Sequence, residues 1–285
     1  MEVCYAFFRK LISCLLLLCL CCGFAAAETA EDPYSVTSLD FGNRWLNIDY
    51  IIGEIEKYPN LERVDMFGTP VGIINMGKLS ERFPGITFGW TIRFKEHAIR
   101  SDATSASTKH SFNSLHHTPV QIALLRYCTQ LKALDIAYNN CDDLSFTAGM
   151  KDLRVLVVSG NRLTDISPLA DLPMLEYLDL SGNTIRDVAP LTGLTNLMDL
   201  NLSNNAVEDL APLAKMTWLK RLWLTRASGR GNLPDETVQM LKEALPDTEI
   251  VFTGKPDWQS GPHFKTIRKM FADNKGYIPF EDSAP

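Results

Sequence analysis

The residues of this sequence that could do chemistry are regularly spaced carboxylates, amides and aromatic rings. Asp165, Asp187 and Asp209 follow one another at intervals of twenty-two residues. Evenly spaced carboxylates can bind calcium, but the chain lacks the dense Gly-Asp nonapeptides of calcium-binding solenoids. Asp commonly forms a local hydrogen bond in a turn. We therefore expect these three side chains to support turns and to hold no metal.

No catalytic motif occurs in the sequence. It contains no glycine-rich phosphate loop, no H-E-x-x-H helix and no G-x-S-x-G elbow. His110, His116 and His117 lie in a polar stretch, residues 101–117, but no carboxylate or cysteine completes a known metal spacing. We interpret 101–117 as an exposed loop. An enzyme subunit that uses this loop is an alternative, but we expect no catalytic residue and no cofactor.

A pattern that repeats every twenty-two residues positions the regularly spaced side chains. Each twenty-two-residue repeat begins with Leu-x-x-Leu-x-Leu. This motif alternates apolar and polar residues, as a half-buried strand does. The first position holds Leu131, Leu153, Leu175, Leu197 and Leu219. The ninth position holds Asn139, Asn161, Asn183 and Asn205, whose amides can bond the backbone of neighbouring turns. We predict stacked strands in a parallel sheet, with a buried asparagine ladder beside them.

The return path between strands is regular as well. Asp-(Ile/Val/Leu)-x-Pro-Leu occurs at 165–169, 187–191 and 209–213, and proline suits the first turn of a short helix. Together, these motifs resemble the leucine-rich repeat family, in its bacterial internalin-like class with twenty-two-residue repeats. The match is complete over 153–218 and partial at 131 and 219. The resemblance implies a curved α/β solenoid with a parallel sheet on the concave face, short helices on the convex side, and a binding role.

The chain divides into four predicted parts. Residues 1–27 contain a basic start, an apolar run and a small-residue cleavage site, which is typical of a secretory signal peptide. An uncleaved membrane anchor is the alternative, although the run is short for a span. Residues 28–130 are predicted to form an N-terminal cap with degenerate repeats, a sheet that begins near Leu61, and the 101–117 loop insertion. Residues 131–226 hold the repeats. Residues 227–285 form a C-terminal cap and tail, with helices at 234–243 and 263–272 and a last strand ending at Phe252.

Composition limits the class of partner. Five of the seven cysteines lie within the predicted signal peptide. The other two, Cys128 and Cys141, occupy apolar repeat positions, so they are either buried thiols or a single disulfide.

The net charge of −6 argues against a nucleic-acid partner. We expect a secreted or cell-surface protein without a stable membrane span after signal cleavage.

The predicted binding surface is the concave side of the sheet. Its side chains vary between repeats while the core positions barely change, which indicates selection for something other than packing. The candidate ligand-binding residues are Asp135, Val157, Tyr177, Asp179, Asp199, Asn201, Arg221 and Trp223. Tyr and Trp are common interface anchors, and the aspartates form an acidic strip. We expect an open face that binds a protein or peptide. Carbohydrate or cell-wall recognition by the same face is the alternative.

Overall fold

The structure is a computed structural model. It describes residues 32–94, 98–108, 119–226, 233–253, 262–272 and 276–281. The predicted signal peptide and the three histidines of the 101–117 stretch lie outside the described residues. Among the residues described, no helix combines the length and apolar composition needed to span a bilayer.

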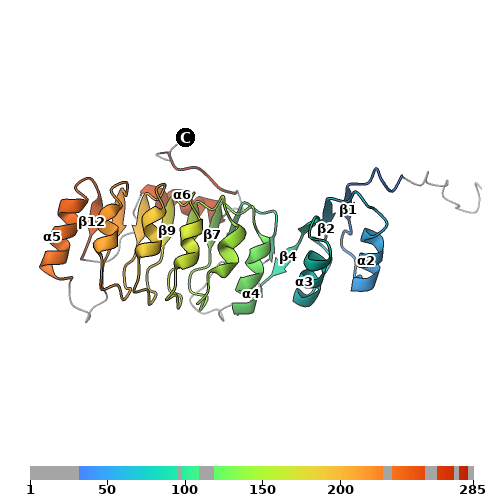
Figure 1. Ribbon diagram of the computed structural model, residues 1–285, viewed down its shortest axis with the longest axis horizontal. Coiled ribbons are helices and arrows are strands. Elements are labelled where there is room, and N and C mark those ends of the chain that lie inside the picture. Colours follow the sequence, from blue (N-terminus) through green and yellow to red (C-terminus); the bar gives the residue numbers. More distant parts are fainter. Residues whose placement is uncertain are drawn as a thin grey trace, which may run out of the picture.

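A seven-stranded parallel sheet forms the main body (Figure 1). Its strands, in spatial and chain order, are β6 (Ser105–Ser107), β7 (Ala133–Asp135), β8 (Val155–Val157), β9 (Tyr177–Asp179), β10 (Asp199–Asn201), β11 (Arg221–Trp223) and β12 (Glu249–Val251). From β7 to β11 each residue pairs with the residue twenty-two positions on, for example Leu156 with Leu178. This register confirms the predicted solenoid, because each repeat contributes one strand.

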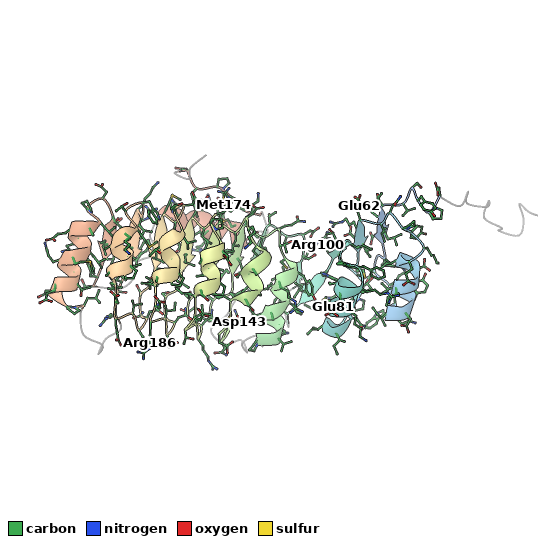
Figure 2. All side chains as sticks on the ribbon, in the orientation of Figure 1. Glu62, Glu81, Arg100, Asp143, Met174 and Arg186 are labelled. Atoms are coloured by element: carbon green, nitrogen blue, oxygen red, sulfur yellow. The ribbon has the colours of Figure 1, made fainter. Side chains whose placement is uncertain are left out.

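Short helices line the other side of the sheet. They are α4 (Pro119–Ala123), the 3-10 helices η1 (Leu124–Tyr127), η2 (Ser145–Gly149), η3 (Ser167–Asp171), η4 (Ala189–Gly193) and η5 (Ala211–Lys215), and α5 (Asp235–Ala244). A proline is the second residue of η3, η4 and η5, in the first turn as predicted. Before each of these helices, an aspartate side chain accepts a backbone N–H bond two residues on: Ser167 N to Asp165 is 2.8 Å and Ala189 N to Asp187 is 2.8 Å. The aspartates therefore support turns, as predicted. Asp143 and Arg186 mark the edge of the solenoid where these turns lie (Figure 2).

The N-terminal part forms a separate sheet. Strands β1 (Ser38–Asp40), β2 (Arg63–Asp65) and β3 (Thr87–Gly89) pair in parallel, with α2 (Ile48–Ile55) and α3 (Ile73–Arg82) between them. Strand β2 confirms the predicted strand near Leu61, but the prediction that the sheet begins there is wrong in two respects. A strand already occurs at Ser38, and this sheet does not continue into the repeats.

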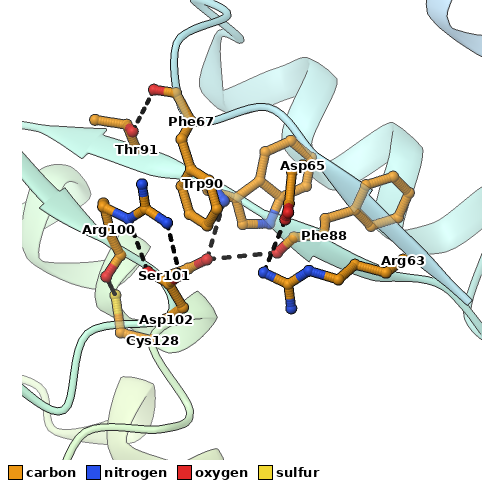
Figure 3. Close-up of polar contacts among 10 residues, drawn as sticks. All are labelled: Arg63, Asp65, Phe67, Phe88, Trp90, Thr91, Arg100, Ser101, Asp102 and Cys128. Atoms are coloured by element: carbon orange, nitrogen blue, oxygen red, sulfur yellow. Dashed lines mark hydrogen bonds and ion pairs between the residues drawn. The ribbon is translucent and has the colours of Figure 1, made fainter. Parts of the chain in front are cut away.

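An antiparallel hairpin explains why the two sheets are separate. Strands β4 (Thr91–Arg93) and β5 (Ala98–Arg100) pair with each other, so neither extends the parallel ladder. At this junction Trp90, which is 2% exposed, bonds Ser101 through its backbone N–H at 2.9 Å (Figure 3). Arg100 pairs with Asp102 at 2.8 Å and stacks 3.5 Å from the centre of the Phe67 ring. The junction therefore continues the hydrophobic core from the N-terminal sheet into the repeats and adds its own polar contacts.

The prediction of an exposed loop from Ser101 is wrong for its first residues. Residues 105–107 form β6, the edge strand of the main sheet, and Ser101, Ser105 and Thr108 are buried. Small side chains hide this strand in the sequence, because Ser-Ala-Ser shows no apolar alternation. The backbone nevertheless continues the ladder: Lys132 N donates to Thr104 O at 2.8 Å and Thr108 N donates to Asp135 O at 3.0 Å.

The four repeat asparagines are buried and bond successive turns. The Asn161 Oδ1 atom accepts the N–H groups of Asn139 at 2.8 Å and Cys141 at 2.9 Å. Its Nδ2 donates to the carbonyls of Ile136 at 3.0 Å and Val158 at 2.9 Å. Asn183 and Asn205 repeat three of these four contacts one and two turns later. Because buried backbone groups need partners, this ladder fixes the turn after each strand.

The residue just before each ladder asparagine has a left-handed backbone. This eighth position holds Tyr138, Gly160, Gly182 and Asn204, with φ of 57°, 64°, 66° and 59°. The position favours glycine, since a Cβ is strained there. Tyr138 is therefore an unusual occupant, and its ring lies over Gly160 of the next repeat.

This arrangement predicts unequal costs for the same substitution in two repeats. A Cβ on Gly160 would lie 2.3 Å from the Tyr138 ring, whereas a Cβ on Gly182 would meet nothing closer than 3.5 Å. We expect Gly160→Ala to lower the free energy of unfolding by about 3 kcal/mol and Gly182→Ala by about 1 kcal/mol. Urea unfolding of both variants measures the difference. Equal losses would show that the Tyr138 ring moves aside at no cost.

The two cysteines outside the predicted signal peptide are free thiols in the core. Cys128 and Cys141 are 0% and 2% exposed and form no disulfide. Burial raises the pKa of Cys128 to about 12 and that of Cys141 to about 11. They therefore act as small apolar residues, and the alternative of a single bridge is wrong.

The C-terminal elements close the fold. Helix α5 and strand β12 confirm the predicted helix at 234–243 and the last strand, since β12 pairs in parallel with β11. Helix α6 (Pro262–Ala272) confirms the predicted helix at 263–272. The sequence did not predict where α6 lies in the fold. The helix packs on the face that holds the candidate residues.

Candidate functional site

The candidate residues lie on one face of the main sheet, at the outward positions of β7 to β11. Asp179 pairs with Asn201 across β9 and β10, and Asn201 pairs with Trp223 across β10 and β11. Tyr177, Asp199 and Arg221 form the neighbouring row in the same register. The regular strand period thus brings together the residues that the sequence singled out, with Asp135 and Val157 on the preceding strands.

The prediction that this face is open is wrong. Helix α6 and the tail residues 276–281 pack on it, on the side of the sheet opposite the short helices (Figure 1). Tyr177, Asp179 and Trp223 are 3%, 0% and 5% exposed. Val157, Asp199 and Asn201 are buried as well, and Asp135 and Arg221 are half-buried. The chain itself therefore covers the surface that the sequence marked for binding.

Apolar contacts hold α6 against small side chains of the sheet. Ile267 and Met270 are 4% and 0% exposed and belong to one buried cluster with Ala133 and Val155. Phe280 of the tail joins this cluster next to Tyr177, with the two ring centres 6.5 Å apart. Alanine and valine on the strands leave room for a helix to lie close to the sheet.

A buried charged group forms where α6 begins. Arg221 Nε donates to Asp199 Oδ1 at 2.7 Å, and His263 Nδ1 lies 2.8 Å from Asp199 Oδ2. The His263 ring stacks on Phe280, with ring centres 4.1 Å apart. Asp199 is 1% exposed and His263 is 5% exposed. Both carboxylate oxygens are therefore satisfied, one by Arg221 of the sheet and one by His263 of the C-terminal segment, which we define as α6 together with residues 276–281.

A second polar contact involves residues that sequence reasoning missed. Glu176, only 4% exposed, forms an ion pair with Arg154 and accepts a bond from Tyr277 Oη at 2.9 Å. The Arg154 guanidinium also lies 5.6 Å from the centre of the Tyr277 ring. Arg154 and Glu176 each occupy the second position of their repeat, just before the strand. Opposite charges in adjacent repeats at one position were the signal that could have revealed them.

Burial changes the acidity of groups on the covered face. The pKa of Asp179 is raised to about 6, chiefly because the carboxylate is desolvated, while bonds from Ser181 and Ser159 oppose the shift. Desolvation also raises the pKa of Tyr177 well above its ordinary value. The acidic strip is therefore a buried feature and not a solvated one.

Three polar atoms on this face have no hydrogen-bond partner among the described residues. They are Tyr177 Oη, Asn201 Nδ2 and Thr225 Oγ1. The Asp179 Oδ1 atom, in contrast, accepts bonds from Ser181 N at 3.0 Å and Ser181 Oγ at 2.7 Å. These three atoms are buried and receive no bond from α6 or from the tail residues 276–281. Within the described ranges, no cluster of His, Cys, Asp or Glu could hold a metal ion.

Comparison with known proteins agrees with this architecture. A family model described as leucine-rich repeats (2 copies) matches three overlapping segments, residues 129–171, 151–193 and 173–215. No curated protein matches the sequence. Solved structures that are similar include internalin C2 of Listeria monocytogenes, at 23% identity and a TM-score of 0.41 over 76% of this chain and 81% of that chain.

Two further structures are similar over about half of their own length. An internalin (InlF) of Listeria monocytogenes is 20% identical over 76% of this chain and 54% of that chain, with a TM-score of 0.41. A leucine-rich repeat protein of Leptospira interrogans is 20% identical over the same shares, with a TM-score of 0.42. The family match, the strand register and the asparagine contacts all describe the same twenty-two-residue unit. Residues 129–215 of this chain therefore match the leucine-rich repeat family, and the chain is similar to the internalins.

Proposed function

We propose that this chain is a secreted or cell-surface protein-binding module whose ligand docks on the concave face. The observation that carries the proposal is that a polypeptide segment already packs there. Ile267 and Met270 fill an apolar patch, and His263 and Tyr277 bond buried charged residues of the sheet. A surface that accepts a helix and an extended tail of its own chain has the shape and chemistry to accept those of another.

The geometry favours a protein ligand over a sugar. Carbohydrate recognition by aromatic residues requires that a ring face be presented to the sugar. Tyr177 and Trp223 are 3% and 5% exposed, so neither ring is presented in this arrangement. The concave surface of a leucine-rich repeat solenoid is also an extended binding surface by construction. We therefore advance protein binding as the function.

Export is supported by the sequence alone. Arg9 and Lys10 precede a short apolar run, and three alanines end at Ala27. This is the order of regions in a secretory signal peptide. N-terminal sequencing of exported protein should find a terminus near Glu28, and an intact Met1 on the exported chain would contradict cleavage.

Site-specific photo-cross-linking tests where the ligand binds. Tyr138 is 40% exposed and lies at the rim of the concave face, against Gly160. Replacing it with p-benzoylphenylalanine keeps an aromatic ring in place. We expect this variant of the mature chain to form covalent adducts with a surface protein of host or neighbouring cells.

Trp45 provides the matched control. It is 89% exposed and belongs to the N-terminal part, before α2. The same photo-reactive residue at this position should give no adduct with the protein captured at Tyr138. Adducts at Trp45 with none at Tyr138 would place the ligand outside the concave face and contradict the proposal.

A further inference from the structure

A cavity of about 270 Å³ opens between α4 and the start of η2, at the N-terminal end of the repeats. Its lining includes Pro119, Val120 and Ile122 of α4, and Cys141, Asp142 and Phe146 of the first repeat. Figure 2 shows the neighbouring Asp143 at the edge of the solenoid, beside α4. None of the candidate residues of the concave face is among the described residues that line this cavity.

A departure from the repeat explains why space is left at this place. Cys141 occupies the eleventh position of its repeat, where the later repeats carry Leu163, Ile185 and Val207. These three side chains are 0%, 0% and 6% exposed, so they fill the core of their own repeats. Pro119 stands at the same position one turn earlier, twenty-two residues before Cys141. Two adjacent turns therefore lack the branched aliphatic side chain that closes a normally close-packed interior.

The cavity has an apolar floor and an acidic mouth. Ile122, Cys141 and Phe146 are 2%, 2% and 4% exposed, whereas Asp142 and Asp143, which also line it, are exposed. Burial is the main cause of the raised pKa of the Cys141 thiol, and the charges of both carboxylates add to it. A thiol held neutral is a poor nucleophile, so binding here is noncovalent. Among the described lining residues there is no lysine, arginine or histidine.

The two carboxylates differ in what they already bind. Asp143 accepts bonds from Ser145, with Oδ1 2.7 Å from the backbone nitrogen and Oδ2 2.6 Å from Oγ. Within the described part of the chain, Asp142 forms no such bond and no ion pair. Asp142 is therefore the carboxylate at the mouth that can pair with a ligand.

The volume limits the size of that ligand. An apolar cavity of about 150 Å³ admits benzene. A cavity of about 270 Å³ therefore holds roughly ten non-hydrogen atoms. This is enough for one aromatic ring with a short side arm. It is too small for a stretch of polypeptide.

We propose that this cavity binds a small molecule that joins one aromatic ring to an ammonium group through a short arm. The ring lies on Ile122, Cys141 and Phe146, and the ammonium group pairs with Asp142 at the mouth. Burial of the ring supplies most of the affinity, while the two carboxylates repel an anion of the same shape. The site is distinct from the concave face, so it adds a second kind of ligand to the proposed protein-binding function.

The first experiment compares three probes of this size that differ in charge: 2-phenylethylamine, 2-phenylethanol and phenylacetate. Each is titrated into the isotopically labelled mature chain, and the amide signals of 119–123 and 141–146 are followed by NMR. We expect the amine to bind about fivefold more tightly than the alcohol, as one exposed ion pair allows, and phenylacetate to bind most weakly. Signal changes centred on other residues, or no binding of the amine, would overturn the proposal.

The second experiment fills the cavity with the side chain that the later repeats use. Cys141→Leu should weaken binding of the amine and the alcohol at least tenfold. Val207→Leu is the matched control, because it enlarges the same position three repeats later and should change neither affinity by more than twofold. Circular dichroism checks folding, and Ala123→Leu fills the cavity from α4 if the first variant does not fold. A folded variant with a filled cavity that still binds the amine would contradict the assignment.

The third experiment isolates the charge. Asp142→Asn should weaken the amine about fivefold and leave the alcohol within twofold, because only the amine loses an ion pair. Asp152→Asn, at an exposed position outside the cavity lining, should change neither. Equal effects of Asp142→Asn on both probes would reject the role of Asp142 and with it the ammonium ligand.

Discussion

Asn161→Leu is expected to lower the free energy of unfolding by about 4 kcal/mol, the largest loss among the substitutions considered. Its side chain bonds the N–H groups of Asn139 and Cys141 and the carbonyls of Ile136 and Val158. Leucine has a similar volume but can satisfy none of them. Each buried backbone group left without a partner costs about 1–3 kcal/mol, and relaxation of the turn recovers part of the sum.

Thermal and urea denaturation of the full chain measure this loss. A change of about 4 kcal/mol corresponds to a fall in Tm of roughly 10 °C for a domain of this size. Asn196→Leu is the matched control, because Asn196 is exposed and makes a single bond to the Pro173 carbonyl at 2.8 Å. It should cost less than about 1 kcal/mol. Similar losses at the two positions would mean that the ladder contributes little to stability.

Asp179→Asn is expected to stabilise the protein at neutral pH and to flatten the dependence of stability on pH. Burial raises the pKa of Asp179 from 3.8 to about 6 in the folded state. The folded chain therefore binds a proton that the unfolded chain has released between about pH 4 and pH 6. Stability contributed by this group is full below about pH 4 and is lost as the pH rises through about 6. The shift corresponds to roughly 3 kcal/mol.

The substitution keeps the contacts that matter for folding. The Oδ1 atom of asparagine can still accept the two bonds from Ser181, and the neutral amide avoids burying a charge beside Asp135. We expect a gain of about 2 kcal/mol at pH 7.5 and little change at pH 4. Urea unfolding at the two pH values measures it. Asp187→Asn, at an exposed turn position, should alter neither value by more than about 0.5 kcal/mol. A wild-type chain whose stability does not fall between pH 4 and 6 would contradict the assignment to Asp179.

The repeat region was predictable from sequence because its buried leucines and asparagines recur at a fixed spacing. One residue type at one spacing, such as Leu at 156 and 178 or Asn at 161 and 183, specifies both the buried side of the strand and the turn that follows. The twenty-two-residue register follows without further information. The helix at 263–272 was predictable for a similar reason, since Ile267 and Phe271 repeat at helical spacing.

Other features depend on contacts that a linear pattern does not encode. Strand β6 consists of Ser-Ala-Ser, which joins the sheet through its backbone and carries no apolar signal. The hairpin at Trp90 to Ser101 separates two sheets whose strands look alike in sequence. The amphipathic pattern of α6 indicates that one side packs against something, but it does not specify which surface. For this reason the candidate residues were found while their burial was not.

The C-terminal segment also changes the mechanics of the solenoid. Neighbouring repeats in such a fold contact only each other, so strain and unfolding normally pass from one repeat to the next. Here Met270 bonds Ser105 on the first strand of the main sheet, while His263 contacts Asp199 and Arg221 on the fifth and sixth. The segment thus runs along the stack as a brace and opposes its bending and stretching. Release of the brace would leave a more compliant solenoid, because the first and sixth strands would then be linked only through the repeats between them.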